Sequence, residues 1–104
     1  MRVGIPFLPQ FHDVMLNGTK TMTSRTRKYG EKGDTFPAFE QVFEIVNVFQ
    51  LRLDVVAWLH SREEGAKDPQ DFMKVWALIH PRKGYVPEQE VWVHEFVRKE
   101  GTKT

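Results

Sequence analysis

One short stretch, Asn17 to Arg25, concentrates hydrogen-bonding chemistry and reads NGTKTMTSR. Its nine residues include two cations, Lys20 and Arg25, and four hydroxyl groups. Ammonium, guanidinium and hydroxyl groups all donate hydrogen bonds, so a cluster of them can hold a planar polar ligand. The stretch therefore predicts a ligand-binding site built on a turn.

The segment that follows the turn is rich in β-branched residues, which predicts a strand. Side chains alternate along a strand, so Thr21, Thr23 and Arg25 are expected on one face. Met22 and Ser24 then belong to the opposite face. The expected site thus uses the first of these faces, next to the turn.

Charge is unevenly distributed along the chain. The net charge is only +1, but residues 19–33 are mostly basic and residues 54–71 are mostly acidic. Such a separation can draw an anionic ligand to one side of a protein. Ordinary solvated faces explain it equally well. In that alternative, Lys20 and Arg25 form surface ion pairs with one of three carboxylates: Asp34, Glu63 or Glu64.

Metal and phosphate-loop chemistry have little support in the sequence. The absence of cysteine excludes disulfides, thiolate metal sites and thiol nucleophiles. The four histidines are widely spaced, and an exposed helix pair explains why His60 and Glu64 lie one helical turn apart. The glycines fit no phosphate-binding pattern. We therefore predict no metal and no cofactor.

The chain has the size and composition of one globular domain. It has 104 residues, of which 40% are hydrophobic, with three Trp and eight Phe. No apolar run approaches a membrane span, and the proline-broken start does not resemble a secretory signal. We expect a domain at residues 1–99, a flexible tail at 100–104, and a soluble cytoplasmic protein. The sequence does not indicate an oligomeric state.

Strands are predicted where β-branched and apolar residues alternate. The long strand is apolar on both faces in its middle, which is typical of a bent barrel strand. The expected strands are 2–8, 21–26, a short piece opened by Thr35 and Phe36, 42–53, and 90–98.

Three helices are predicted between these strands. The first runs from Pro9 to the stop at Asn17-Gly18, the second from an Asp54 cap to Gly65, and the third starts at Asp68-Pro69. Because strands outnumber helices without regular alternation, we predict an α+β fold, a small mixed barrel with about three packed helices. The helical spacing predicts that these residues are core: Trp58, Phe72, Val75, Trp76 and Ile79.

The octet Gly18 to Arg25 resembles the GxKxxExR signature of the ASCH family, small domains with the PUA-like fold. Thr23 stands where that signature has its glutamate. This form is similar to the branch of the family that contains the bacterial N4-acetylcytidine amidohydrolase. The order of elements, the Gly33-Asp34 turn and the Glu64-Gly65 pair also fit, so the resemblance covers nearly the whole chain.

The resemblance implies three catalytic roles: Lys20 as proton acceptor, Thr23 as nucleophile and Glu64 as proton donor. Glu63 is an alternative to Glu64, since the spacing to the next helix is shorter by one residue. Adjacent helical residues point about 100° apart, so only one of the two can face the site. The implied reaction is hydrolysis of the acyl amide of an N4-acetylcytidine-type nucleoside.

The PUA-like resemblance also implies a second function, a non-catalytic RNA-binding module. The run Arg25-Thr26-Arg27-Lys28 favours it, because phosphate contacts need clustered cations. The net charge near zero argues against RNA binding. Thr23 in place of glutamate favours hydrolysis. The predicted partner is a modified nucleoside or RNA, with four further contact residues: Thr21, Arg25, Arg27 and Lys28.

Overall fold

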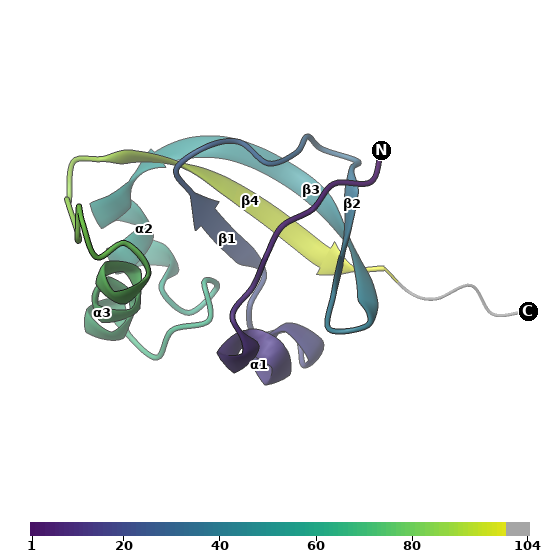
Figure 1. Cartoon of the computed structure of the whole chain (residues 1–104), viewed down its shortest axis with the longest axis horizontal. Helices are drawn as coiled ribbons and strands as arrows, with labels where there is room; N and C mark the ends of the chain where they lie inside the picture. Colours follow the sequence, from purple (N-terminus) through teal and green to yellow (C-terminus); the bar gives the residue numbers. More distant parts are fainter. Residues whose placement is uncertain (100–104) are drawn as a thin grey trace, which may run out of the picture.

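The computed structural model describes residues 1–99 as one curled sheet with helices beneath it (Figure 1). The expected tail at 100–104 lies outside the described residues. In chain order the elements are a 3-10 turn Pro9–Phe11, α1 His12–Leu16, β1 Met22–Arg25, β2 Thr35–Ala38, β3 Gln41–Arg52, α2 Leu53–His60, α3 Pro69–Ile79 and β4 Glu90–Arg98. None of the helices within residues 1–99 is long and apolar enough to cross a membrane.

The sheet has four antiparallel strands in the order β1-β4-β3-β2. The long central strand β3 changes register between Ile45 and Asn47. A bulge of this kind bends a strand and increases its twist, which accounts for the curled half-barrel shape. The predicted fold class, α+β with a small barrel-like sheet and about three helices, is confirmed.

Two hydrophobic clusters hold the layers together. One joins α1 and the N-terminal segment to the sheet through aromatic rings, among them Phe36, Phe43 and Phe96. The other joins α2 and α3 to the opposite end of the sheet through residues such as Leu53 and Trp76. Between these two anchored ends the helical layer is open, and this is where the candidate site lies.

Two local predictions near the strands and helix starts are wrong. Residues 2–8 form no strand and pair with the sheet only through a parallel bridge between Arg2 and Thr35, since Pro6 and Pro9 restrict the segment. Asp54 does not cap α2, because the helix begins at Leu53 and the Asp54 carboxylate instead pairs with Arg52 at 2.8 Å. By contrast, Asp68 caps α3 as predicted.

The expected helix core is partly confirmed. Phe72 and Trp76 are buried, whereas Trp58 is 58% exposed. Val75 is half-buried and Ile79 is exposed, and both line an open cavity. Helical spacing identifies which residues share a face, but it does not reveal whether another element covers that face.

Candidate functional site

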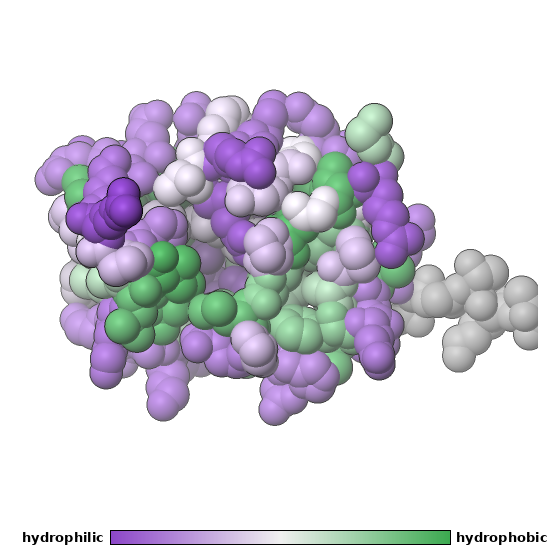
Figure 2. Space-filling view, in the orientation of Figure 1, coloured by the Kyte–Doolittle hydropathy of each residue, from purple (hydrophilic) through white to green (hydrophobic). Residues whose placement is uncertain are grey.

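A cavity of about 640 Å³ opens between α1 and α3 on the helical side of the sheet. Figure 2 shows apolar surface over both helices and hydrophilic atoms in the hollow between them. The apolar walls include Phe7, Phe11 and Trp76. Its polar lining includes Lys20, Ser24, Arg25 and Glu64.

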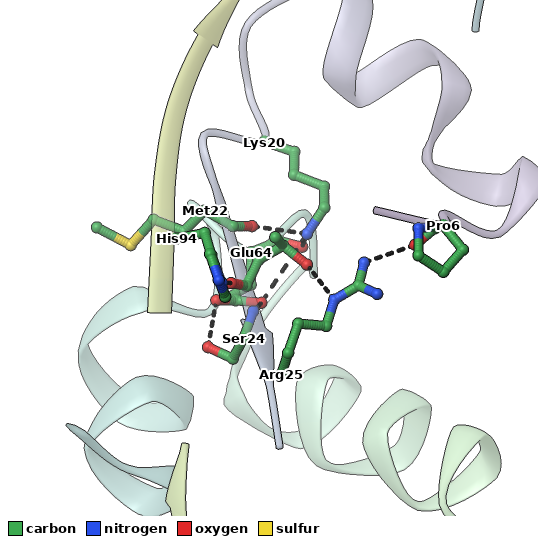
Figure 3. Close-up of polar contacts among 8 residues, drawn as sticks. Pro6, Lys20, Met22, Ser24, Arg25, Glu64 and His94 are labelled. Atoms are coloured by element: carbon green, nitrogen blue, oxygen red, sulfur yellow. Dashed lines mark hydrogen bonds and ion pairs between the residues drawn. The ribbon is translucent and has the colours of Figure 1, made fainter. Parts of the chain in front are cut away.

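Lys20 is placed in this cavity by the turn that ends α1. Gly18 takes the positive φ of 85° that a helix stop favours, and the Lys20 backbone N–H donates to the Val14 carbonyl at 2.9 Å. The Lys20 residue is only 3% exposed. Its Nζ donates to the backbone carbonyls of Met22 at 2.7 Å and Glu64 at 2.6 Å (Figure 3).

Burial changes the acid-base behaviour of this amine. Loss of water lowers the pKa of Lys20 to about 8, with Arg25 contributing in the same direction and Glu64 opposing. The Phe11 ring covers the ammonium at 4.6 Å from its centroid. At pH 7 about a tenth of such an amine is neutral, so Lys20 can act as a base.

Glu64, rather than Glu63, faces the cavity. The Glu64 residue is 6% exposed, and its carboxylate accepts hydrogen bonds from Ser24 Oγ at 2.7 Å and Ser24 N–H at 3.3 Å. Its Oε1 lies 3.9 Å from Lys20 Nζ. The Glu63 side chain is 46% exposed and lies 3.8 Å from His60. The structure thus brings Lys20 and Glu64 together from positions 44 residues apart.

Gly65 allows this close approach. Its φ is 93°, and a Cβ at this position would lie 3.0 Å from Lys20 Cδ. The turn is also fastened to the start of β1, because the Glu63 carbonyl accepts from the backbone N–H groups of Thr21 and Met22. A side chain at position 65 would therefore push against the lysine on which the site is centred.

Arg25 connects Thr23 to the N-terminal segment. Its Nε donates to Thr23 Oγ1 at 3.0 Å and its Nη2 donates to the Pro6 carbonyl at 2.7 Å. Burial lowers the pKa of Arg25, and its guanidinium lies over the rings of Phe7 and Tyr29. Thr23 is 4% exposed, with its hydroxyl next to Arg25. Within residues 1–99, no hydrogen bond joins this hydroxyl directly to Lys20 Nζ.

His94 on β4 contacts the backbone of Thr23 on the neighbouring strand β1. The sequence did not predict this contact. It is fully buried, its Nε2 accepts from the Tyr29 backbone N–H at 3.0 Å, and its Nδ1 lies 3.3 Å from the Thr23 carbonyl. Burial lowers the pKa of His94. These contacts match a neutral imidazole that carries its proton on Nδ1. His94 therefore ties the Thr23 backbone to the loop after β1.

The other expected contact residues lie outside the cavity. Thr21 is half-buried, and its backbone forms hydrogen bonds with Glu63 and Phe96. Arg27 and Lys28 are exposed. Arg27 lies over the Tyr29 ring at 4.2 Å, and Lys28 over the Trp92 ring at 5.1 Å. The alternative pairing of Lys20 or Arg25 with Asp34 is not formed, because the Asp34 carboxylate lies 3.3 Å from the N-terminal amine.

Ser24 is a cavity residue that alternation along the strand did not predict. It was placed on the face opposite Thr23 and Arg25, yet it lines the same cavity as Arg25. The turn that carries Glu64 reaches this edge strand from a distant part of the chain, which strand periodicity cannot indicate. Within the described residues, no group of three or more His, Asp or Glu side chains is arranged to hold a metal ion.

No protein-family model and no curated protein matches this sequence. Solved structures do match. Hypothetical protein PH0355 aligns with a TM-score of 0.72 and 13% identity, over 95% of this chain and 100% of that one. An ASCH domain from Lactobacillus crispatus aligns with a TM-score of 0.63 and 12% identity, over 93% of this chain and 79% of that one. The chain has the ASCH-domain fold.

A variant of ZmASCH from Zymomonas mobilis extends this likeness. It aligns with a TM-score of 0.63 and 13% identity, over 92% of this chain and 68% of that one. At 12% to 14% identity, these ASCH-domain structures establish the fold, while the chemistry of the site has to be argued from its own residues. The resemblance of the octet around Lys20 to the ASCH signature agrees with this fold.

Proposed function

We propose that this protein is an amidohydrolase that acts on an acylated cytidine-type nucleoside. The observation that carries the proposal is Lys20, a buried amine with a pKa of about 8 that lies beside Glu64 in an aromatic-walled cavity. A structural lysine on the surface has no reason to be held in this way. Perturbed bases in clefts are typical of catalytic sites.

The cavity suits a nucleobase. Its volume of about 640 Å³ lies in the range of small-molecule sites, roughly 300 to 1,000 Å³. The aromatic side chains Phe7, Phe11 and Trp76 in its walls give an apolar lining for a planar base. Lys20, Ser24 and Glu64 lie together in the lining, where they can contact the exocyclic amide of the base.

The proposed reaction begins with attack by the Thr23 hydroxyl on the acyl carbonyl. The hydroxyl proton passes to neutral Lys20, and the oxygen forms an ester with the acyl group as the amide C–N bond breaks. Glu64 relays this proton from the Lys20 ammonium to the departing exocyclic amine, and water then hydrolyses the ester and restores the Thr23 hydroxyl. The products are the deacylated nucleoside and a carboxylic acid.

Two contacts support this assignment of roles. Two N–H groups of a neutral Lys20 can keep the bonds to Met22 and Glu64, which leaves its lone pair free to accept a proton. Arg25 already donates to Thr23 Oγ1, so its guanidinium is close to where negative charge would develop on the acyl oxygen. Thr23 is not among the residues that line the cavity, so the proposal requires its side chain to rotate toward the cavity.

The test is incubation of the purified protein with N4-acetylcytidine and a panel of other acylated nucleosides, with chromatography of nucleoside and acid. We expect release of cytidine and acetate, and a loss of at least 100-fold in kcat/KM for Lys20→Ala and Thr23→Ala. Lys74→Ala, an exposed lysine on α3, serves as the matched control and should keep wild-type turnover. The absence of turnover across the whole panel would contradict the proposal.

RNA binding without catalysis is a second candidate, favoured by one observation. Arg27 and Lys28 are exposed cations lying over the Tyr29 and Trp92 rings. Cations beside aromatic faces suit phosphates and unstacked bases. Affinity for a single-stranded RNA should then fall steeply with salt, and replacing both cations by alanine should reduce the slope by about one to two. A flat salt response would rule this candidate out.

A further inference from the structure

Ser24 makes two contacts that no assigned catalytic role explains. Its Oγ–H donates to Glu64 Oε2 at 2.7 Å, and its backbone N–H donates to Glu64 Oε1 at 3.3 Å. The same Oε1 stays 3.9 Å from Lys20 Nζ, beyond hydrogen-bonding distance. The two opposite charges therefore form a long ion pair in a buried site, with no hydrogen bond between them.

The backbone around Glu64 is fixed, so its side chain decides this separation. The Glu64 N–H donates to the His60 carbonyl at 2.9 Å, and the preceding carbonyl accepts two N–H groups from the start of β1. Ser24 is equally fixed, in a strand pair opposite Val93. The Glu64 side-chain torsions are left free, and without an anchor they would let the carboxylate swing toward the ammonium.

We propose that Ser24 is a positioning residue: it holds the Glu64 carboxylate away from Lys20 so that the lysine amine can lose its proton and serve as a base. The inference rests on the proposed function for its catalytic meaning. Its structural content, that Ser24 acts on Lys20 through Glu64, stands on the contacts alone (Figure 3).

Within residues 1–99, Glu64 is the one charged group near Lys20 that favours the protonated amine. Arg25 on β1 is the other charge that acts on the amine, and it favours the neutral form. The N-terminal segment and the 3-10 turn contribute the uncharged rings of Phe7 and Phe11. Further titratable groups line the wider cavity, among them Lys67, Asp71 and His80. The charged side chains of α1 and of the turn before Glu64 are about half or more exposed: His12, Asp13 and Glu63.

The test is an NMR titration of the Lys20 side chain in the full-length protein, with its resonance assigned by its loss in Lys20→Met. In Ser24→Ala the carboxylate is expected to close onto Nζ and raise the pKa of Lys20 by about one unit, as expected for a charge moving from 3.9 Å to about 2.8 Å at an effective dielectric of about 20. Ser24→Thr keeps the hydroxyl and should restore the wild-type titration.

Removing the Glu64 charge distinguishes this role from a general structural one. Glu64→Gln should lower the pKa of Lys20, since Glu64 raises it in the wild type. Adding Ser24→Ala to Glu64→Gln should then change nothing further, because Ser24 acts through the carboxylate. An unchanged or lowered pKa in Ser24→Ala, or a Ser24 effect that persists without the Glu64 charge, would overturn the inference.

The pH dependence of the reaction tests the catalytic part of the inference. The rise of kcat/KM with pH should move about one unit to higher pH in Ser24→Ala, with KM nearly unchanged at high pH and recovery in Ser24→Thr. If the wild type turns over no acylated nucleoside, the proposed function fails, and the titration still decides what Ser24 does. If the wild type is active and Ser24→Ala keeps the wild-type pH profile, the positioning role alone fails.

Discussion

The segment from Lys20 to Lys28 carries two pairs of cations that the tertiary structure treats in opposite ways. Lys20 and Arg25 lie against aromatic rings, and each donates hydrogen bonds to two oxygens of the protein. Arg27 and Lys28 are exposed and lie across Tyr29 and Trp92. The inner pair has lowered pKa values, whereas the outer pair faces solvent, where Lys28 pairs with the exposed Glu31.

The difference shows how burial changes the acid-base behaviour of a basic side chain. A lysine in water is a fixed positive charge, but the same side chain at 3% exposure lies close to the point where it gains and loses a proton. The hydrogen bonds from Lys20 Nζ to the Met22 and Glu64 carbonyls then fix the direction in which the neutral amine can accept a proton. The outer cations have only screened charge to offer, which suits weak contacts with phosphates.

The largest expected difference between the two pairs is the pH dependence of stability. The folded-state pKa of Lys20 is about 8, against an ordinary value of 10.5. Between these values the unfolded chain binds a proton that the folded protein does not, so stability rises with pH by about 3 kcal/mol in total. Urea unfolding from pH 7 to 10.5 should show this rise relative to Lys20→Met. Parallel curves for the two proteins would contradict it.

Arg25 should have the next largest effect. Arg25→Ala removes two charge-assisted hydrogen bonds, to Thr23 and to the Pro6 carbonyl, and should lower the free energy of unfolding by about 2 kcal/mol. Arg25→Lys keeps a charge but cannot span both acceptors, so it should recover less than half of the loss. Urea denaturation at pH 7 measures both, and an Arg25→Ala protein of wild-type stability would show that these bonds do not anchor the segment.

His94 gives a smaller effect, in the acid range. Its folded-state pKa lies below the ordinary 6.5, so the unfolded chain gains a proton first as the pH falls. Stability should therefore decline below about pH 6.5, as protonation of Nε2 would also break the bond from the Tyr29 N–H. His94→Gln should show a shallower decline in thermal unfolding between pH 7 and 5. An equally steep decline would assign the acid sensitivity to other groups.

The outer cations should have the smallest effect on folding. Arg27→Ala and Lys28→Ala are each expected to change the free energy of unfolding by less than about 0.5 kcal/mol, as is usual for exposed positions. The Lys28 pair with Glu31 at 2.6 Å is exposed and screened. A loss above 1 kcal/mol in urea denaturation would mean that the stacking on Tyr29 or Trp92 is structural, and the contrast between the pairs would be reduced.

The elements that local chemistry specifies were predictable. Gly18 ends the first helix, Asp68 with Pro69 begins α3, and the alternating apolar residues of β4 mark its bounds at Glu90–Arg98. Predictions that required a packing partner were less successful. Trp58 has helical spacing typical of core but is 58% exposed, and residues 2–8 have strand-like alternation but their bridge to the sheet is at Arg2.

The sequence by itself determined that Lys20, Thr23 and Arg25 share one turn and one strand, because strand periodicity is a local property. Only the tertiary structure decided that Glu64 rather than Glu63 meets Lys20, that Ser24 holds its carboxylate, and that the amine loses its water. These outcomes depend on a turn some 40 residues along the chain docking onto an edge strand. No pattern of neighbouring residues encodes that contact, since burial and pairing arise from packing between distant segments.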